Sequence, residues 1–188
     1  NRKIFPAEAD CGTRCRRIRH RRDPFFLLDV LAEVRKSDPD ACLYIIGDGD
    51  AGYVDSVKAA IGEKGLESCV FWQKKAPQYQ MKGVYQQADL FLLPTEYEIF
   101  GMVLLEAMFF RRVVLTTPNG GADMLLRSGE NGLVLEKSDP ARWAKTLLDT
   151  VADPEKKARM EQAAYETVIH ENTWDALADR FLAVYEKR

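Results

Sequence analysis

Short apolar runs alternate with longer amphipathic segments along most of this chain, and that order constrains the fold more than any other feature. The runs expected to form buried strands are residues 42–47, 69–72, 90–93, 113–116 and 132–135. The segments expected to form helices between them are residues 25–35, 53–64, 79–88 and 101–110, followed by a short helix after Gly120-Gly121. Strands separated by helices need crossover connections, so the pattern predicts an α/β fold with a parallel sheet covered by helices on both faces.

The C-terminal part of the chain is expected to be a helical tail. Residues 143–188 contain no run typical of a strand, and Ser138-Asp139-Pro140 is a helix-start signal. Trp174, Leu177, Phe181, Leu182 and Tyr185 recur at helical spacing and predict an apolar face that packs in the ordinary way.

Length and charge favour one domain that does not bind nucleic acid. The chain has 188 residues, 46% of them hydrophobic, and a formal net charge of −2. Its arginine-rich segment, residues 14–22, has no interleaved aromatic residues, so no nucleic-acid partner is expected. Residues 1–16 are interpreted as an irregular start or linker and residues 17–188 as a single domain. The start at Asn1 without Met predicts a piece cut from a longer protein.

The cysteines and histidines do not form a metal-binding pattern. The four cysteines have no paired C-x-x-C spacing, and His20 and His170 are far apart and not paired with a glutamate at helical spacing. We therefore expect no metal site. Free thiols and the absence of any apolar stretch near the ~20 residues of a spanning helix favour a cytoplasmic setting.

Glu98 and Glu106 are the first candidates for a binding site. They lie eight positions apart, close to two helical turns, with Gly101 between them at the expected helix start. Carboxylates accept hydrogen bonds from the vicinal hydroxyls of a sugar, and a helix N-terminus offers free N–H groups to a phosphate. The alternative, that both are solvated surface acids, stays open on spacing alone, as does a solvated basic loop for Arg17 and Arg22.

An ordered set of short motifs resembles the C-terminal, donor-binding domain of glycosyltransferase family 4, the retaining sugar transferases with the two-domain GT-B fold. The motifs are Arg17-Ile18 with Arg22; Pro39-Asp40 leading into residues 43–49; residues 85–89 with Leu93-Pro94; residues 98–108; Gly120-Gly121; residues 129–133; Asp153-Pro154; and Thr173-Trp174. Each motif is weak alone, whereas the ordered set is specific and covers nearly the whole chain from residue 17. The resemblance implies a Rossmann-like sheet, the C-terminal half of the GT-B fold.

The resemblance also implies roles for individual residues. Glu106 would accept hydrogen bonds from the ribose of a nucleotide, and Glu98 would contact the transferred sugar. Arg17 and Arg22 would hold the diphosphate as negative charge builds on the leaving group. The remaining donor-site residues that it implies are Phe100, Gly101, Met102 and Val103 through their backbone, with Gly47 and Gly49 near the nucleotide.

The function implied is transfer of a hexose from a nucleoside diphosphate sugar, UDP- or GDP-linked, without a cofactor. The acceptor would be a glycan or lipid, as in cell-envelope polysaccharide synthesis, bound by an N-terminal domain that this chain lacks. The fragment alone is expected to be inactive, and the full protein could associate peripherally with the inner face of the membrane.

The sequence also departs from the family pattern. Arg22 replaces a lysine, Arg16 and Ile99 replace glycines, and Met124 stands where an acid often follows the double glycine. Two other readings therefore stay open: a non-catalytic nucleotide or sugar-binding module, and a nucleotide-sugar 2-epimerase of the same architecture.

Overall fold

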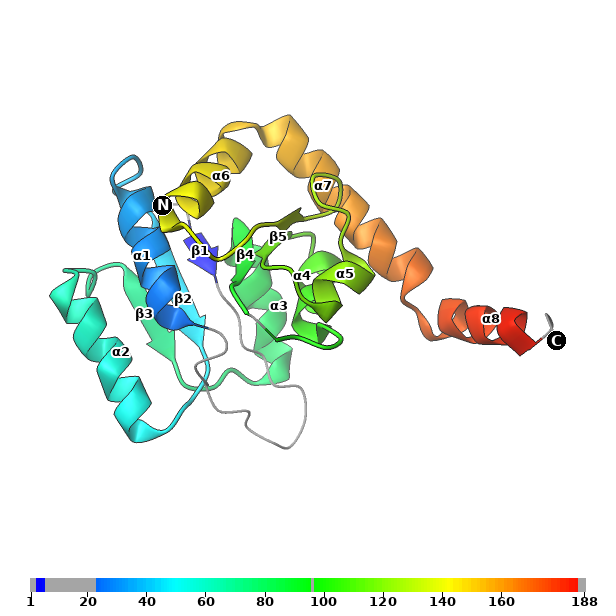
Figure 1. Cartoon of the computed structure of the whole chain (residues 1–188), viewed down its shortest axis with the longest axis horizontal. Coiled ribbons are helices and arrows are strands. Elements are labelled where there is room, and N and C mark those ends of the chain that lie inside the picture. The colour runs from blue at the N-terminus through cyan, green and yellow to red at the C-terminus, as the bar shows by residue number, and fades with distance from the viewer. Residues whose placement is uncertain (1–2, 6–22, 96, 186–188) are drawn as a thin grey trace.

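A parallel sheet forms the centre of the computed structural model, which describes residues 3–5, 23–95 and 97–185 (Figure 1). The described residues form one six-stranded sheet in the order β3-β2-β1-β4-β5-β6, and every neighbouring pair is parallel. The strands are β1 (Lys3–Phe5), β2 (Cys42–Ile46), β3 (Val70–Gln73), β4 (Leu90–Leu93), β5 (Val113–Thr116) and β6 (Leu133–Val134). The predicted α/β class and parallel arrangement are confirmed.

Helices connect the strands and continue beyond the last of them. They are α1 (Pro24–Arg35), α2 (Ala51–Glu63), α3 (Gln78–Gln87), α4 (Met102–Phe109), α5 (Gly120–Leu125), α6 (Pro140–Ala152), α7 (Pro154–Glu166), the π-helix η2 (Thr167–Glu171) and α8 (Trp174–Tyr185). The predicted helices all form, with ends within about two residues of the expected ones. Asp139 caps α6 by accepting a hydrogen bond from Ala141 N, and Pro140 occupies the first turn, as the helix-start signal indicated.

The first strand differs from the sequence interpretation, which treated residues 1–16 as irregular. Lys3–Phe5 pair with β2 on one side and with β4 on the other, so β1 lies in the middle of the sheet. Its run is too short and too close to polar sequence to stand out by hydrophobic pattern. Pairing with strands on both sides, rather than local propensity, defines it.

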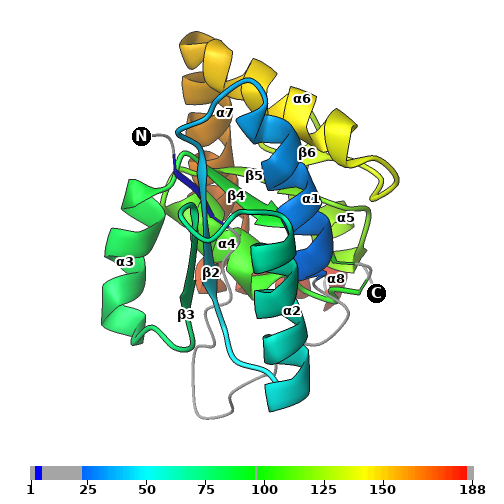
Figure 2. The same ribbon diagram turned by 90° about the vertical axis from the view of Figure 1, so that its left-hand side faces the viewer.

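Two apolar clusters, one on each face, hold the helices to the sheet. Leu90 and Leu92 of β4 belong to the cluster under α1, α2 and α6, whereas Phe91 and Leu93 belong to the cluster under α3, α4 and α7. Figure 2 shows α3 on the opposite side of β2 and β3 from α1 and α2. Because successive residues of a strand point to opposite faces, β4 is buried throughout.

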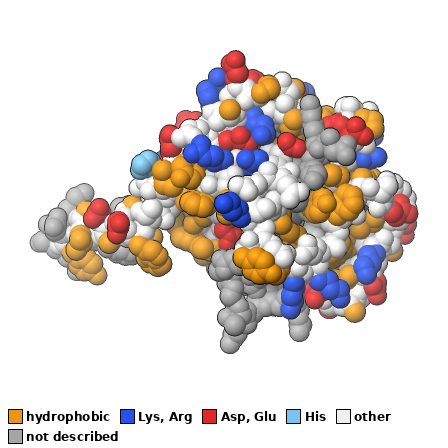
Figure 3. Space-filling view, turned by 180° about the vertical axis from the view of Figure 1, so that it is seen from behind, with side chains coloured by type: hydrophobic (Ala, Val, Ile, Leu, Met, Phe, Trp, Pro, Cys, Tyr) orange, Lys and Arg blue, Asp and Glu red, His pale blue; other side chains and the backbone are white. Residues whose placement is uncertain are grey.

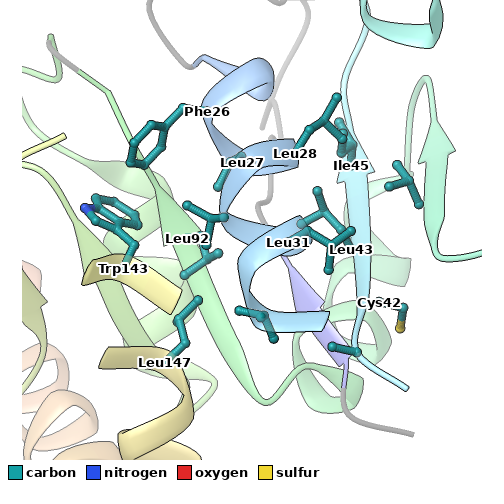
Figure 4. Close-up of a cluster of buried hydrophobic side chains, with 14 of the residues drawn as sticks. Phe26, Leu27, Leu28, Leu31, Cys42, Leu43, Ile45, Leu92, Trp143 and Leu147 are labelled. Carbon is teal, nitrogen blue, oxygen red and sulfur yellow. The ribbon is translucent and has the colours of Figure 1, made fainter. Parts of the chain in front are cut away.

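A fully buried tryptophan fixes α6 against α1. The ring of Trp143 meets the ring of Phe26 edge to face, with centroids 5.2 Å apart (Figure 4). Its indole N–H donates to the Glu136 carbonyl at 3.0 Å, so the polar edge of the ring is satisfied.

The apolar stripe of α8 does not pack as expected. Trp174, Leu182 and Tyr185 are 87%, 58% and 71% exposed. The helix extends away from the sheet beyond η2, and orange apolar side chains lie along this arm in Figure 3. Ordinary packing is therefore wrong for these three side chains. No helix in the described part of the chain has the length and apolar character needed to cross a membrane.

Arg111, two residues beyond the end of α4, gives the first prediction because its backbone is left-handed, with φ 55°. Its guanidinium lies 4.2 Å from the Tyr165 ring centroid and donates a hydrogen bond to Gln162. Arg111→Gly and Arg111→Ala both lose these contacts, but only alanine keeps a Cβ in the unfavourable conformation. We expect the glycine variant to be the more stable of the two by about 1 kcal/mol in urea unfolding.

Lys145, exposed within α6, is the matched control. There the order should reverse, with alanine more stable than glycine by about 1 kcal/mol, because a helix interior disfavours glycine. An alanine variant at position 111 that equals or exceeds the glycine variant would show that the backbone is not strained there.

Candidate functional site

The sheet reverses its strand order between β1 and β4, and this topology places the site. From β1 the chain runs outward through β2 and β3, whereas β4, β5 and β6 lie on the other side. In open parallel sheets, ligands bind beyond the carboxyl ends of the strands at such a switch point. The residues described there, between β4 and α4, are 94–95 and 97–101.

Glu98 caps the turn that starts α4. Its Oε1 accepts a hydrogen bond from Gly101 N at 3.1 Å. Gly101 has φ 77°, and a Cβ at this position would lie 2.8 Å from the Leu104 side chain. Only glycine fits this turn without strain, so Glu98 and Gly101 form one local unit at the helix N-terminus.

The start of α5 packs backbone to backbone against the same turn. Gly121 N donates to Glu98 O at 3.0 Å. A Cβ on Gly120 would lie 3.1 Å from Glu98 O and Ile99 O, and one on Gly121 would lie 3.0 Å from Gly101 N. The double glycine therefore permits a close approach that brings the N-termini of α4 and α5 to one loop.

Buried polar side chains support this loop from below. Asn119 donates to Thr116 Oγ1 at 3.2 Å and to Thr117 O at 2.8 Å, and its Oδ1 caps α5 by accepting from Ala122 N. Thr116 in turn donates to Leu93 O at 2.7 Å. Thr117 donates to the Thr95 carbonyl. We call Thr95, Thr116, Thr117 and Asn119 the polar floor; it ties the ends of β4 and β5 together.

Sequence reasoning missed this floor. The N-cap of α5 is Asn119, whereas Asp123 is exposed in the first turn of that helix. The signal that was present is an asparagine directly before the double glycine, a common N-cap residue.

Glu106 lies one turn further along α4 and faces α3. The Tyr85 hydroxyl donates to its Oε2 at 3.0 Å. Burial raises the pKa of the Glu106 carboxyl, and the hydrogen bond from Tyr85 opposes that rise. The sequence analysis noted Tyr85 within a motif but assigned it no role.

The structure brings some predicted site residues together and leaves others apart. Glu98 and Gly101 share one turn, whereas the described partner of Glu106 comes from α3 rather than from that turn. The side chains of Phe100 and Met102 are 39% and 56% exposed. The side chain of Val103 lies in the core, so only its backbone can face a ligand.

Gly47 and Gly49 follow β2 and lie at the same carboxyl edge of the sheet. Gly47 donates to Gln73 O at 2.9 Å and accepts from the Trp72 indole at 2.8 Å, so its backbone joins the ends of β2 and β3. Gly49 N donates to the Asp48 side chain at 3.0 Å, an interaction typical of aspartate in a turn.

Arg17 and Arg22 lie outside the described residues, so their phosphate role stays a prediction. Within the described ranges, no group of three or more His, Cys, Asp or Glu residues is arranged to hold a metal ion.

The close approach of α5 gives a prediction with an internal control. Gly121→Ala places a methyl group against the backbone of Phe100 and Gly101, so the loop must move, at a cost of about 1 to 3 kcal/mol. Gly83→Ala, in α3 where an added Cβ meets nothing within 4 Å, should instead stabilise the fold by about 0.5 to 1 kcal/mol. Urea unfolding of both variants tests this, and equal effects would contradict it.

Glu106 gives a pH-dependent prediction. Since its pKa is raised in the folded state, its contribution to stability is present at acidic pH and is lost as pH rises through the folded-state pKa. Glu106→Gln removes the buried negative charge and keeps an acceptor for Tyr85. The free energy of unfolding of the variant, relative to wild type, should therefore rise between about pH 4 and pH 7.

Glu136→Gln, at an exposed position, controls for the removal of one negative charge. A Glu106→Gln variant whose relative stability is the same at both pH values, or follows that control, would show that burial of the carboxylate is not costly.

Curated relatives of this chain are named as glycosyltransferases. The chain is 27% identical over 175 residues to the D-inositol 3-phosphate glycosyltransferase of Corynebacterium efficiens, covering 91% of this chain and 41% of that protein. It is 29% identical over 173 residues to the enzyme of the same name from Corynebacterium diphtheriae, covering 90% and 40%. The chain thus spans about two fifths of the length of these relatives.

Solved structures share the fold. The C-terminal domain of the glycosyl transferase group 1 family protein LpcC from Francisella tularensis matches with a TM-score of 0.79 at 20% identity, over 92% of this chain and 87% of that one. HepE from Anabaena, solved in complex with UDP and glucose, matches with a TM-score of 0.79 at 21% identity, over 100% and 49%. These neighbours confirm the Rossmann-like sheet of a GT-B C-terminal domain.

The family model described as glycosyl transferases group 1 matches residues 14–167, which include the β4–α4 turn, the double glycine and the polar floor. This chain therefore belongs to the glycosyl transferases group 1 family.

Proposed function

We propose that this chain is the donor-binding domain of a retaining glycosyltransferase of family 4, which transfers a hexose from a nucleoside diphosphate sugar. The observation that carries the proposal is the unit formed by Glu98, Gly101 and Gly121, with Glu106 one turn away. This unit has the Glu98 carboxylate and a helix N-terminus in the loop that follows β4, beside the switch point of the sheet, and Glu106 follows along α4. Relatives named as glycosyltransferases and a neighbour solved with UDP support it.

In this proposal the nucleotide lies across the carboxyl ends of the strands. Glu106 accepts hydrogen bonds from the ribose hydroxyls, and Glu98 orients the sugar. The backbone N–H groups at the start of α4 face the phosphates, where the helix dipole favours negative charge. Gly47 and Gly49 approach the nucleotide through their backbone.

The chemical step needs stabilisation of the departing diphosphate. Arg17 and Arg22 supply this positive charge in the proposal, and Glu98 holds the sugar in line with its leaving group. The acceptor, a glycan or lipid, and any contact with the inner face of a membrane belong to the longer protein that the relatives represent, and are likewise proposals.

One observation favours a second candidate, a nucleotide or sugar-binding module without transfer activity. Ile99 and Met124, at two positions that depart from the family pattern, are 65% and 64% exposed. Ile99 lies in the turn before α4 and Met124 lies in α5, and each has an apolar side chain where the pattern has glycine or an acid.

A thermal-shift panel of UDP, GDP and ADP with this chain tests donor binding. A nucleotide present at 100 times its dissociation constant should stabilise the fold by about 2.7 kcal/mol, and Glu106→Ala should lose most of that stabilisation. Glu130→Ala, at an exposed site, should keep it. No stabilisation by any of the three nucleotides would contradict the proposal.

Transfer activity separates the two candidate functions. The transferase predicts that the longer protein releases nucleoside diphosphate from the donor sugar and that Glu98→Ala abolishes this release. If the chain is a binding module, the nucleotide should bind, but neither the longer protein nor its Glu98→Ala variant should release nucleoside diphosphate from the donor sugar.

A further inference from the structure

We propose that Tyr85 is a positioning residue for the nucleotide, because its hydroxyl holds Glu106 Oε2 and so directs Oε1 toward the ribose hydroxyls. The inference rests on the proposed function, since it assigns a ligand to Glu106. Tyr85 belongs to α3 and reaches α4 through this hydrogen bond.

Tyr85 is a rigid anchor. It is 1% exposed, and its ring stacks on Phe110 with centroids 5.2 Å apart and planes at 19°. On another side the ring lies 5.9 Å from Phe91, tilted by 46°. A side chain packed on both sides cannot follow a moving carboxylate, so the hydroxyl fixes the position of Oε2.

Glu106 keeps one oxygen for a ligand. The hydrogen bond from Tyr85 reaches Oε2, and no described residue donates a hydrogen bond to Oε1. Oε1 is also not among the described buried polar atoms that lack a partner, so solvent reaches it. A carboxylate with one oxygen fixed and the other open is suited to accept from vicinal hydroxyls, and it loses less rotational freedom when it does so.

Tyr85 also favours the ionised form of Glu106, which accepts hydrogen bonds. Burial raises the pKa of Glu106, and the donated hydrogen bond from Tyr85 lowers it. No described Lys, Arg, Asp or Glu contributes to the shift. The cations that follow α4 are engaged elsewhere: Arg111 with Gln162 and Tyr165, and Arg112 with backbone carbonyls and, at 4.0 Å, Glu161.

Tyr85→Phe tests the inference, because it removes the hydroxyl and keeps the ring. The probes are whichever of UDP and GDP binds wild type more tightly, and its 2′,3′-dideoxy counterpart, each titrated by calorimetry. We expect the variant to bind the ribonucleotide about 3- to 10-fold more weakly at pH 7, the value of one hydrogen bond. The loss should vanish with the dideoxy nucleotide. As the pH is lowered, Glu106 takes up a proton and ribonucleotide binding weakens. In the variant this weakening should begin at a higher pH than in wild type, because the pKa of Glu106 rises further without the Tyr85 hydroxyl.

Tyr53→Phe is the matched control, since Tyr53 is a buried tyrosine of α2 whose ring packs against Phe25. It should leave both affinities and the pH profile unchanged. An equal loss of affinity for both nucleotides in Tyr85→Phe would indicate a merely structural role and overturn the inference. The inference would also be overturned if Tyr85→Phe kept the wild-type affinity and pH profile while Glu106→Ala bound the ribonucleotide weakly. That result would leave the proposed function intact. Wild type that binds neither nucleotide would overturn both proposals.

If Tyr85→Phe does not fold, carbon-13 NMR of wild type decides the question. The Tyr85 Cζ resonance should titrate with the same midpoint as the Glu106 carboxyl and should shift on adding the ribonucleotide, but not the dideoxy nucleotide. Independent midpoints would overturn the inference.

Discussion

The backbone contact between the start of α5 and the β4–α4 turn is the constraint on which the site depends. Gly121 N donates to Glu98 O, and a Cβ on Gly120 or Gly121 would lie 3.1 or 3.0 Å from backbone atoms of that turn. This contact fixes the turn from the side, while Glu98 caps it from within. The close approach of the two helix N-termini to one loop therefore depends on the double glycine, whereas Gly101 N holds the carboxylate of Glu98.

α4 connects this turn to the sheet and to α3. Its buried residues pack on β4 and β5, while Glu106 contacts α3 through Tyr85. The ionised form of Glu106 is disfavoured by burial. A half-buried acid held by one hydrogen bond lowers the stability of the fold at neutral pH, and such a cost is typical of residues retained for binding.

Much of the fold could be predicted from the sequence because the strands are apolar runs with clear breaks. β4 and β5 match their predicted residues, and Asp139 caps α6 as expected. β1 could not be found in this way, since its three residues are defined by partners on both sides. The exposure of Trp174 was missed because periodicity shows that a helix has an apolar face, not whether anything covers it.

The candidate site could be predicted in part. The spacing of Glu98, Gly101 and Glu106 indicated a helix start flanked by acids, and the structure has that helix start. Spacing could not show that Glu98 binds Gly101 N, or that the partner of Glu106 comes from α3. Those contacts depend on how distant segments pack, which no local pattern encodes.

The polar floor and the exposed residues above it differ in how freely they can change. Thr95, Thr116 and Thr117 are buried and hydrogen-bonded at the strand ends, whereas Phe100 and Met102 reach solvent. Substitutions of Phe100 and Met102 should cost little folding free energy, so selection can change these residues while the polar floor is preserved. Such a division makes the domain evolvable: ligand preference can diversify without a new architecture.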